Sequence, residues 1–249
     1  MSQKPFVISH RGANRLAPEN TLAAFEKALE FGVDGFENDC HMTADGHVVV
    51  IHDETVDRTS NGTGHVYQKT LAELRELDFG SWFSPEFAGT KIPTLEEWFG
   101  LCGSLKVINV ELKRAPDGST ASAAATITLA KKMGLFDRLI ISSFDMDMLE
   151  ACKAADPVAR TCLLFSPVTP ISEDVMDEPV EFAKQHDLYA YHPFVGMLGQ
   201  DFIEECQEAG IVVNAWVVNQ SHGIEALRDW GCDGIITDEP ELTMQVVYG

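Results

Sequence analysis

The stretch Phe6-Val-Ile-Ser9 opens the pattern that decides the fold, because a helical segment over Glu19–Phe31 follows it and Gly35-Phe-Glu-Asn-Asp39 comes next. The first and third segments are short and rich in residues that favour strands. The middle segment repeats apolar residues at helical spacing, and Gly32 is a common helix stop directly after it. A strand, a helix and a strand in this order predict a parallel pair joined by a right-handed crossover.

The same alternation recurs along the chain. Further strands are predicted at His47–Ile51, Leu105–Glu111, Arg138–Ser142, Arg160–Leu164, Leu188–Tyr191, Ile211–Val217 and Gly234–Thr237. Helical patterns cover Ala121–Met133, Asp147–Ala155, Gln200–Ala209 and Gly223–Asp229. About eight strand–helix units at this length favour an α/β fold of the closed (β/α)8 type, a TIM barrel. An open doubly wound sheet is the alternative.

One segment interrupts the alternation. Residues 53–91 are rich in Thr, Gly, Asp and aromatic side chains and form too long a stretch for an ordinary loop. We therefore predict one barrel domain over residues 1–249, with a small insertion at about 53–91, after a strand ending at His52. If His52 ends a barrel strand, the insertion lies over the mouth of the barrel.

The balance of charge excludes two classes of partner. The 249 residues include 18 Lys and Arg against 39 Asp and Glu, for a formal net charge of −21. Such a field repels nucleic acid and anionic membrane surfaces, so we expect no nucleic-acid partner and no stable membrane association. It also repels anionic substrates. An enzyme acting on phosphates would need a cation to make its site attractive.

The cysteines and the first residues favour a reducing compartment. The six cysteines show no CxxC pair and no zinc-site spacing, and most lie in apolar runs where reduced thiols are common. The opening MSQKPFVISH has no apolar segment of signal-peptide length. No stretch approaches the length of a membrane span. We expect a soluble, cytoplasmic protein.

Ionisable residues stand where the predicted strands end. His10 follows the first strand, Glu37 and Asp39 close the second, His52 follows the third, and Glu111 closes the next. In a TIM barrel these ends converge on one face, where active sites lie. Residues far apart in the sequence would then share one pocket.

Three of these residues predict a metal site. Glu37 and Asp39 are two apart, so on a strand they point to the same side. With Glu111 they offer three hard oxygen ligands suited to one divalent cation, Mg²⁺ or Ca²⁺. The alternative for any single one is an ordinary solvated acid. Their shared position at the ends of apolar strands favours the metal site.

Two histidines and two basic residues complete the candidates. His10 and His52 are candidate general acid and base, because imidazole titrates near neutrality. Arg11 and Lys113 can bind phosphate oxygens. The alternative interpretation is that they form salt bridges within the site. The remaining histidines are interpreted as ordinary residues, although His192 follows a late strand.

At this point the chain resembles the glycerophosphodiester phosphodiesterases. The motifs that carry the resemblance span nearly the whole chain and occur in a specific order: His10-Arg-Gly12, Pro18-Glu-Asn-Thr21, Glu37-Asn-Asp39, Thr43-Ala-Asp-Gly46, Val50-Ile-His-Asp53, Asp57-Arg-Thr59, Asn61-Gly-Thr-Gly64, Val110-Glu-Leu-Lys113, Ser143-Phe-Asp145, Trp216-Val-Val-Asn219 and Gly234-Ile-Ile-Thr-Asp238. Asn38 and His41 are more polar than the family pattern at their positions.

The resemblance implies a barrel enzyme that hydrolyses glycerophosphodiesters to sn-glycerol 3-phosphate and an alcohol. It implies His10 and His52 as the acid–base pair and a divalent cation, Mg²⁺ or Ca²⁺, on the three acids above. Arg11 and Lys113 would hold the phosphate, Glu19 would line the polar end of the site, and Trp216 would pack against the substrate. The nucleophile would be the glycerol 2-hydroxyl or water. The residues do not assign which histidine is the acid.

Two rival functions stay open at this level. A lysophospholipase D-like diesterase acting on lipid would need an apolar approach, which the aromatic residues over 79–87 could supply. The alternative interpretation is that these aromatic residues form a small core within the insertion. A non-catalytic barrel that binds a phosphate ligand would have little need of two histidines and three carboxylates together. We expect a small-molecule phosphodiester substrate and a monomer or homodimer.

Overall fold

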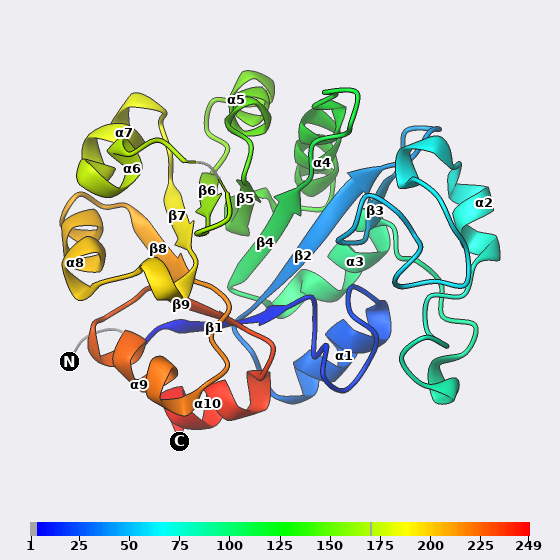
Figure 1. The fold of residues 1–249 in the computed structure, drawn as a ribbon, viewed down its shortest axis with the longest axis horizontal. Coiled ribbons are helices and arrows are strands. Elements are labelled where there is room, and N and C mark those ends of the chain that lie inside the picture. Colours follow the sequence, from blue (N-terminus) through cyan, green and yellow to red (C-terminus); the bar gives the residue numbers. More distant parts are fainter. Residues whose placement is uncertain (1–3, 170) are drawn as a thin grey trace.

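The computed structural model describes residues 4–169 and 171–249. In this part of the chain the strands form one nine-stranded sheet that closes on itself, because β1 pairs with both β2 and β9 (Figure 1). All pairings are parallel except that of β3 with β2. The (β/α)8 barrel is thus confirmed. The strands are β1 (Phe6–His10), β2 (Gly35–Met42), β3 (Val48–Val50), β4 (Val107–Leu112), β5 (Leu139–Ser143), β6 (Thr161–Phe165), β7 (Ala190–Pro193), β8 (Val212–Ala215) and β9 (Gly234–Thr237).

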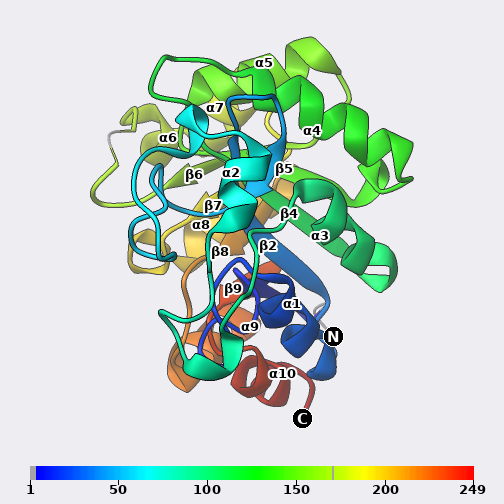
Figure 2. The same ribbon diagram turned by 90° about the vertical axis from the view of Figure 1, so that its right-hand side faces the viewer.

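Helices surround the barrel (Figures 1 and 2). They are α1 (Leu22–Glu30), α2 (Leu71–Glu76), α3 (Leu95–Leu101), α4 (Ala121–Lys132), α5 (Met146–Ala155), α6 (Asp174–Asp177), α7 (Pro179–Gln185), α8 (Gln200–Glu208), α9 (Ser221–Asp229) and α10 (Pro240–Tyr248). Short 3-10 turns lie at Val66–Gln68, Pro85–Phe87, Cys102–Ser104, Phe136–Arg138 and Val195–Met197. No helix among these described residues is long and apolar enough to cross a membrane.

The first helix begins later than its sequence pattern predicts. The hydroxyl of Thr21 accepts a hydrogen bond from the Ala24 amide and caps the helix, which therefore starts at Leu22 rather than at Glu19. Asn20 has a left-handed backbone (φ 58°), so the chain before the cap is not helical. Glu19 is thereby left on a loop, free to turn toward the mouth.

The third predicted strand is not a barrel strand, which corrects the expectation for His52. β3 pairs antiparallel with the end of β2, with Cys40 opposite Val50. A tight turn at Gly46 (φ 83°) joins the two strands, and so short a connection permits only antiparallel pairing. β3 ends at Val50, so His52 stands in the loop just past it. The backbone amide of Ile51 still donates to the Asp39 carbonyl at 2.9 Å, which holds this loop against β2.

Two apolar layers fix the barrel. Outward side chains of the strands pack against the helices, as where Phe36 of β2 lies 5.0 Å between ring centroids from Phe25 of α1 and near Trp98 of α3. Inward side chains fill the barrel at its lower levels, among them Ile8, Val107, Ile140, Cys162, Ala190 and Ile236. Because side chains alternate along a strand, the polar residues at the strand ends stand above this filling.

The segment over residues 53–91 has a small core of its own. Val56, Val66, Leu74 and Phe79 are buried together in it with Val49, Ile51 and Ile92 at its edges. It lies beside β3, outside the ring of barrel helices (the cyan and teal segment of Figures 1 and 2). Packing of this kind explains how so long a connection keeps a fixed shape.

Candidate active site

The end of β1 sets the first two side chains of the site. After His10 the chain turns sharply through Arg11 (φ 57°) and Gly12 (φ 80°), both left-handed. A side chain at Gly12 would also come within 2.6 Å of the Ala24 backbone, so only glycine fits there. The Arg11 amide donates to the backbone carbonyl of Glu37 at 3.0 Å. This turn directs His10 and Arg11 toward the carboxyl end of β2.

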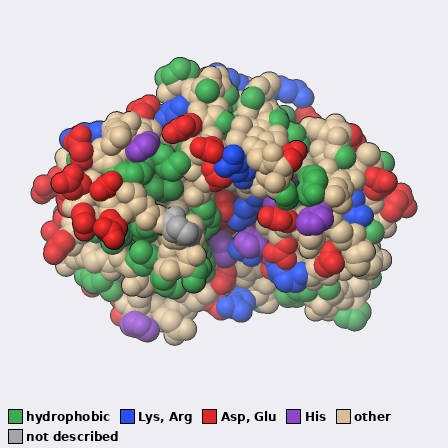
Figure 3. Space-filling model, turned by 45° about the horizontal axis from the view of Figure 1, so that its top comes forward, with side chains coloured by type: hydrophobic (Ala, Val, Ile, Leu, Met, Phe, Trp, Pro, Cys, Tyr) green, Lys and Arg blue, Asp and Glu red, His purple; other side chains and the backbone are tan. Residues whose placement is uncertain are grey.

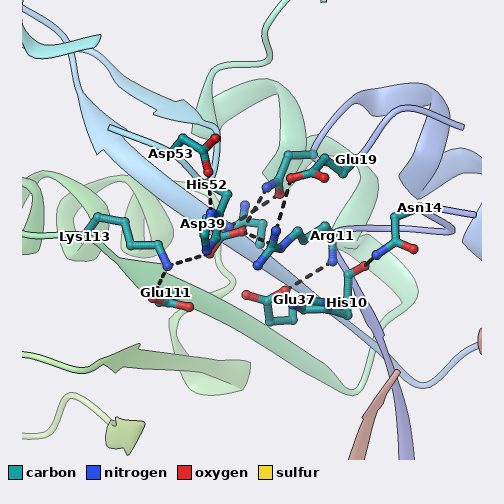
Figure 4. A network of polar contacts seen from close by, with 12 residues as sticks. His10, Arg11, Asn14, Glu19, Glu37, Asp39, His52, Asp53, Glu111 and Lys113 are labelled. Atoms are coloured by element: carbon teal, nitrogen blue, oxygen red, sulfur yellow. Dashed lines mark hydrogen bonds and ion pairs between the residues drawn. The ribbon is translucent and has the colours of Figure 1, made fainter. Parts of the chain in front are cut away.

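The three predicted acids come together at this end of the barrel (Figure 4). Glu37 and Asp39 face inward from β2 and Glu111 from β4, and the register of the two strands places Asp39 opposite Glu111. One oxygen from each of the three lies within 4.8 Å of the others. All three are buried, so water does not screen their repulsion.

Two basic side chains, Arg11 and Lys113, form ion pairs with Asp39. Arg11 Nε lies 3.1 Å from one oxygen of Asp39, and Lys113 Nζ lies 2.9 Å from the other. Lys113 also forms an ion pair with Glu111. Three carboxylates against two cations leave one negative charge without a partner. That excess is what a cation bound at the three acids would neutralise.

The pKa values of the three acids reflect this excess of negative charge. Burial, together with the charges of Asp39 and Glu111, raises the pKa of Glu37 well above its usual range. Burial also raises the pKa of Glu111 to about 7, although Lys113 opposes it. Burial would raise the pKa of Asp39 too, but Lys113 and Arg11 outweigh it and hold that pKa well below the usual range.

His10 is oriented by a carboxylate from the last barrel strand. Its Nδ1 lies 2.6 Å from Asp238 Oδ1, just past β9. Two amides hold Asp238 in turn: Asn14 Nδ2 donates to Oδ1 at 2.5 Å, and Asn219 Nδ2 donates to Oδ2 at 2.8 Å. Burial would raise the pKa of Asp238, but the hydrogen bond from His10 and these donors lower it. With Nδ1 engaged, Nε2 is the free ring nitrogen of His10.

His52 has an equivalent arrangement from the other side. Its Nδ1 lies 2.7 Å from Asp53 Oδ1, and its Nε2 lies 4.0 Å from Asp39. Arg58 of the insertion grips Asp53 with Nε at 2.7 Å and Nη2 at 3.0 Å, and it lowers the pKa of Asp53 to about 2. Burial lowers the pKa of His52, which Asp39 opposes and Lys113 reinforces.

Glu19 joins the two halves of this network. Its carboxylate accepts from Arg11 Nη1 at 3.1 Å and from Arg58 at 2.8 and 2.9 Å. Hydrogen bonds from Arg58 and the charge of Arg11 lower the pKa of Glu19 against the effect of its burial. Glu19 thus lies beside the site, and its side-chain partners are both arginines.

Both histidines and part of this network border one small cavity of about 90 Å³. Its wall is charged on one side and apolar on the other, as Figure 3 shows for the hollow at this face. Trp216 stands on the apolar side, with Phe144 at 5.6 Å and Phe194 at 5.8 Å between ring centroids. The lining residues are His10, Arg11, Glu37, His52, Asn109, Glu111, Phe144, Leu164, Trp216 and Ile236. A wider, more open hollow continues past Lys113.

The glycerophosphoryl diester phosphodiesterase family model matches residues 10–242. The chain belongs to this family. It is an enzyme of the phosphodiesterase class. The match begins at His10 and includes every site residue predicted from the sequence. A glycerophosphodiester phosphodiesterase from Caldanaerobacter subterraneus is 39% identical over 98% of both chains. One from Bacillus subtilis is 32% identical over 97% of this chain and 86% of that protein.

Solved structures of the family share the fold. A phosphodiesterase of Oleispira antarctica, in complex with the product sn-glycerol-3-phosphate, is 29% identical with a TM-score of 0.88, over 99% of this chain and 98% of that one. A glycerophosphodiester phosphodiesterase of Thermotoga maritima is 30% identical with a TM-score of 0.80, over 99% and 100% of the two chains.

All nine residues predicted for the site of this phosphodiesterase meet around the barrel mouth, but their orienting partners were not predicted. Asp238, Asp53 and Arg58 each lie within motifs quoted for the family, yet only the fold shows what they contact. His192 lies inside the barrel, fully buried, where Asn214 Nδ2 reaches its Nε2 at 2.8 Å. Burial lowers its pKa to about 3, so it is a neutral interior residue.

The two residues that depart from the family pattern lie close by without entering the cavity. His41 Nε2 lies 3.0 Å from the backbone carbonyl of His52 and so supports the loop that carries His52. Asn38 faces outward from β2, and its Oδ1 accepts a weak hydrogen bond from the Cys40 thiol at 3.5 Å. Neither residue borders the small cavity.

Proposed function

We propose that the chain hydrolyses glycerophosphodiesters to sn-glycerol 3-phosphate and an alcohol. His10 and His52 act as the general acid–base pair, and Glu37, Asp39 and Glu111 hold a divalent cation. The observation that carries the proposal is that both histidines border one cavity with Nδ1 fixed by a carboxylate, beside the three acids.

The two histidines supply proton transfer from opposite sides. A carboxylate on Nδ1 fixes the tautomer that has its proton there and leaves Nε2 for the substrate. One Nε2 takes the proton of the nucleophile, either water or the glycerol 2-hydroxyl, and the other gives a proton to the departing alkoxide oxygen. Proton transfer of this kind accounts for a factor of about 10² to 10⁴ per residue.

Arg11 and Lys113 bind the phosphate. Both stand beside the cavity and already pair with Asp39, so their charges are fixed in place before substrate arrives. Burial opposes the charge of Lys113, but Asp39 and Glu111 outweigh it and raise the Lys113 pKa, so the ammonium stays charged throughout the neutral range. Positive groups that need no reorganisation stabilise the charge that develops on phosphoryl oxygens.

The donor set fits a divalent cation. Three buried carboxylate oxygens within 4.8 Å of one another are hard ligands of the kind that Mg²⁺ or Ca²⁺ takes. The raised pKa values of Glu37 and Glu111 support this site, because a bound cation would favour the ionised form of both acids. When bound, the ion would polarise a phosphoryl oxygen as a Lewis acid.

The size of the cavity favours a small alcohol over a lipid. Its apolar side is a short wall of Phe144, Leu164 and Trp216, suited to the carbon frame of a glycerol unit. The aromatic residues expected to guide a lipid instead pack on each other: Phe83 stacks edge-on with both Trp82 and Phe87. None of residues 79–87 borders the cavity, so we place the lysophospholipase D-like function second.

We extend the proposal to the protein as a whole. We propose one catalytic domain over residues 1–249, with the insertion at 53–91 bracing the site through Arg58. We also propose a cytoplasmic location, supported by six cysteines that are all buried and unpaired. A small-molecule diester is the expected partner, for a monomer or homodimer.

The test is release of sn-glycerol 3-phosphate from glycerophosphocholine, with and without EDTA, followed by addition of Mg²⁺ or Ca²⁺. We expect EDTA to abolish release and one ion to restore it. Cleavage that persists unchanged in EDTA would contradict the metal site. Failure to cleave any glycerophosphodiester with either ion, while phosphate still binds, would favour the non-catalytic barrel.

A further inference from the structure

One buried polar side chain that borders the cavity has no partner. Asn109 of β4 borders the cavity and is only 1% exposed, yet neither its Nδ2 nor its Oδ1 has a hydrogen-bond partner among the described residues. A buried amide left unpaired costs about 1–3 kcal/mol, so most such groups in folded proteins are satisfied by something. Here the cavity is the side from which a partner can come.

The strand register places Asn109 beside Glu37 and His10. Side chains alternate along a strand, so Asn109 faces inward one step deeper than Glu111, and β2 sets it directly opposite Glu37. Ile236 stands one step deeper than Asp238 in the same way and also borders the cavity. Asn109 is thus level with Glu37 and His10 and one inward step deeper than Glu111, in the wall of the cavity.

The chemistry of an amide selects its ligand. Asn109 offers donors at Nδ2 and an acceptor at Oδ1, and both ends are free. A metal ion or an ionised phosphoryl group could satisfy only one of these ends, because each lacks the opposite hydrogen-bonding function. Hydroxyl groups both donate and accept, so vicinal hydroxyls on a short carbon frame fit the two ends together.

We propose that Asn109, from the cavity wall beside Glu37, recognises the hydroxyls of the substrate's glycerol unit and so determines specificity for glycerol diesters. This proposal rests on the proposed function. The glycerol unit enters first and the second alcohol stays toward the open mouth, where it can leave. Contact with Asn109 therefore selects the part of the substrate that is common to all glycerophosphodiesters, whatever the alcohol.

The experiment compares two substrates in two proteins. Asn109→Leu keeps the size of the side chain and removes both hydrogen-bonding ends. We expect it to lower kcat/KM for glycerophosphocholine about tenfold to a hundredfold, the effect of losing buried hydrogen bonds to substrate. For a bis-nitrophenyl phosphate, which has no hydroxyls, kcat/KM should stay near the wild-type value. Ser142→Ala is the matched control: Ser142 is buried on β5 with an unpartnered hydroxyl, but it does not border the cavity.

A binding measurement separates specificity from catalysis. Measured by calorimetry, Asn109→Leu should weaken the binding of sn-glycerol 3-phosphate by a similar factor. The affinity for inorganic phosphate should stay unchanged. Equal losses for both substrates, or no loss for either, would overturn the proposal in favour of a role in metal placement or a merely bound water. If the leucine variant fails to fold, Asn109→Ala gives the same comparison. A wild-type protein that neither cleaves glycerophosphocholine nor binds sn-glycerol 3-phosphate would overturn the proposed function itself.

Discussion

At the scale of single residues, the site works through pairs. Each histidine has one carboxylate at Nδ1, but the carboxylates differ in their own partners. Two asparagines hold Asp238, with the exposed Arg15 at 3.7 Å, while Arg58 holds Asp53 with two hydrogen bonds. The close guanidinium of Arg58 neutralises Asp53 more fully than the distant, solvated Arg15 neutralises Asp238. The two imidazoles therefore stand in different electrostatic surroundings, as the proposed acid and base acting in one step require.

Replacing either histidine should remove most activity. His10→Ala and His52→Ala should each lower kcat about 10² to 10⁴-fold, because each removes one proton-transfer group. Circular dichroism and the binding of the divalent cation should match the wild type. His186→Ala, at the end of α7, is the control and should leave kcat unchanged. A double histidine variant with full turnover would refute the acid–base assignment.

Asp238 should make stability depend on pH in a defined direction. Its pKa is depressed in the folded protein, so its contribution to the free energy of unfolding is fully present above the unfolded pKa, about 4 for Asp. That contribution falls away as pH drops below this value. The loss is complete only when pH has fallen through the folded pKa, so urea titrations at pH 6 and pH 3 should show the free energy of unfolding of the wild type losing part of its excess over that of Asp238→Asn. A constant difference between the two proteins at both pH values would show that His10 does not stabilise the charged carboxylate.

At the scale of elements, the insertion acts as a brace. Arg58 reaches from it to two loops of the barrel, gripping Asp53 beside His52 and Glu19 before α1. The small core of the insertion, which includes Val56, fixes the position of the Arg58 backbone. An exposed ion pair adds little to the free energy of unfolding. A guanidinium that contacts two carboxylates with several hydrogen bonds, as Arg58 does, fixes the positions of both carboxylates.

Cutting this brace should affect catalysis more than folding. Arg58→Gln should lower kcat/KM on the order of tenfold to a hundredfold, because small displacements of a catalytic group are costly. Limited proteolysis within residues 53–91 should become faster. Arg75→Gln removes another ion pair of the same segment, with Glu97, and should change neither readout much. Equal kcat/KM in the two variants would argue that Arg58 does not position His52 through Asp53.

At the scale of the whole molecule, cation binding should be linked to folding. A ligand that binds only the folded state stabilises it, and at a hundredfold excess over Kd the Tm of a chain this size should rise by roughly 5 to 10 °C. The rise should vanish in the double variant Glu37→Gln and Glu111→Gln, measured by calorimetry. Glu86→Gln removes an exposed acid of the insertion and should keep the full shift. An unchanged shift in the double variant would place the cation elsewhere.

The barrel and most of its strands were predictable because they depend on local patterns. Short apolar runs alternating with helical periodicity admit few arrangements, and the strand ends carry the polar residues to one face. The predictions were wrong where a local signal had two readings. β3 looks like any valine-rich strand, and only its pairing with β2 shows that it lies outside the barrel. Helices α2, α3, α6, α7 and α10 were not predicted: the first four are only four to seven residues long, and α7 and α10 begin at proline.

The sequence by itself determined which residue types stand at the strand ends, and so the set of histidines, acids and cations that meet at the mouth. Tertiary structure alone decided their partners. Asp238 lies 228 residues from His10 along the chain, and closure of the barrel through β1 and β9 brings them to 2.6 Å. The pairing of β4 with β2 likewise sets the buried, unpaired Asn109 opposite Glu37. Hydrogen-bond geometry depends on distances in space, which residue spacing along the chain does not contain.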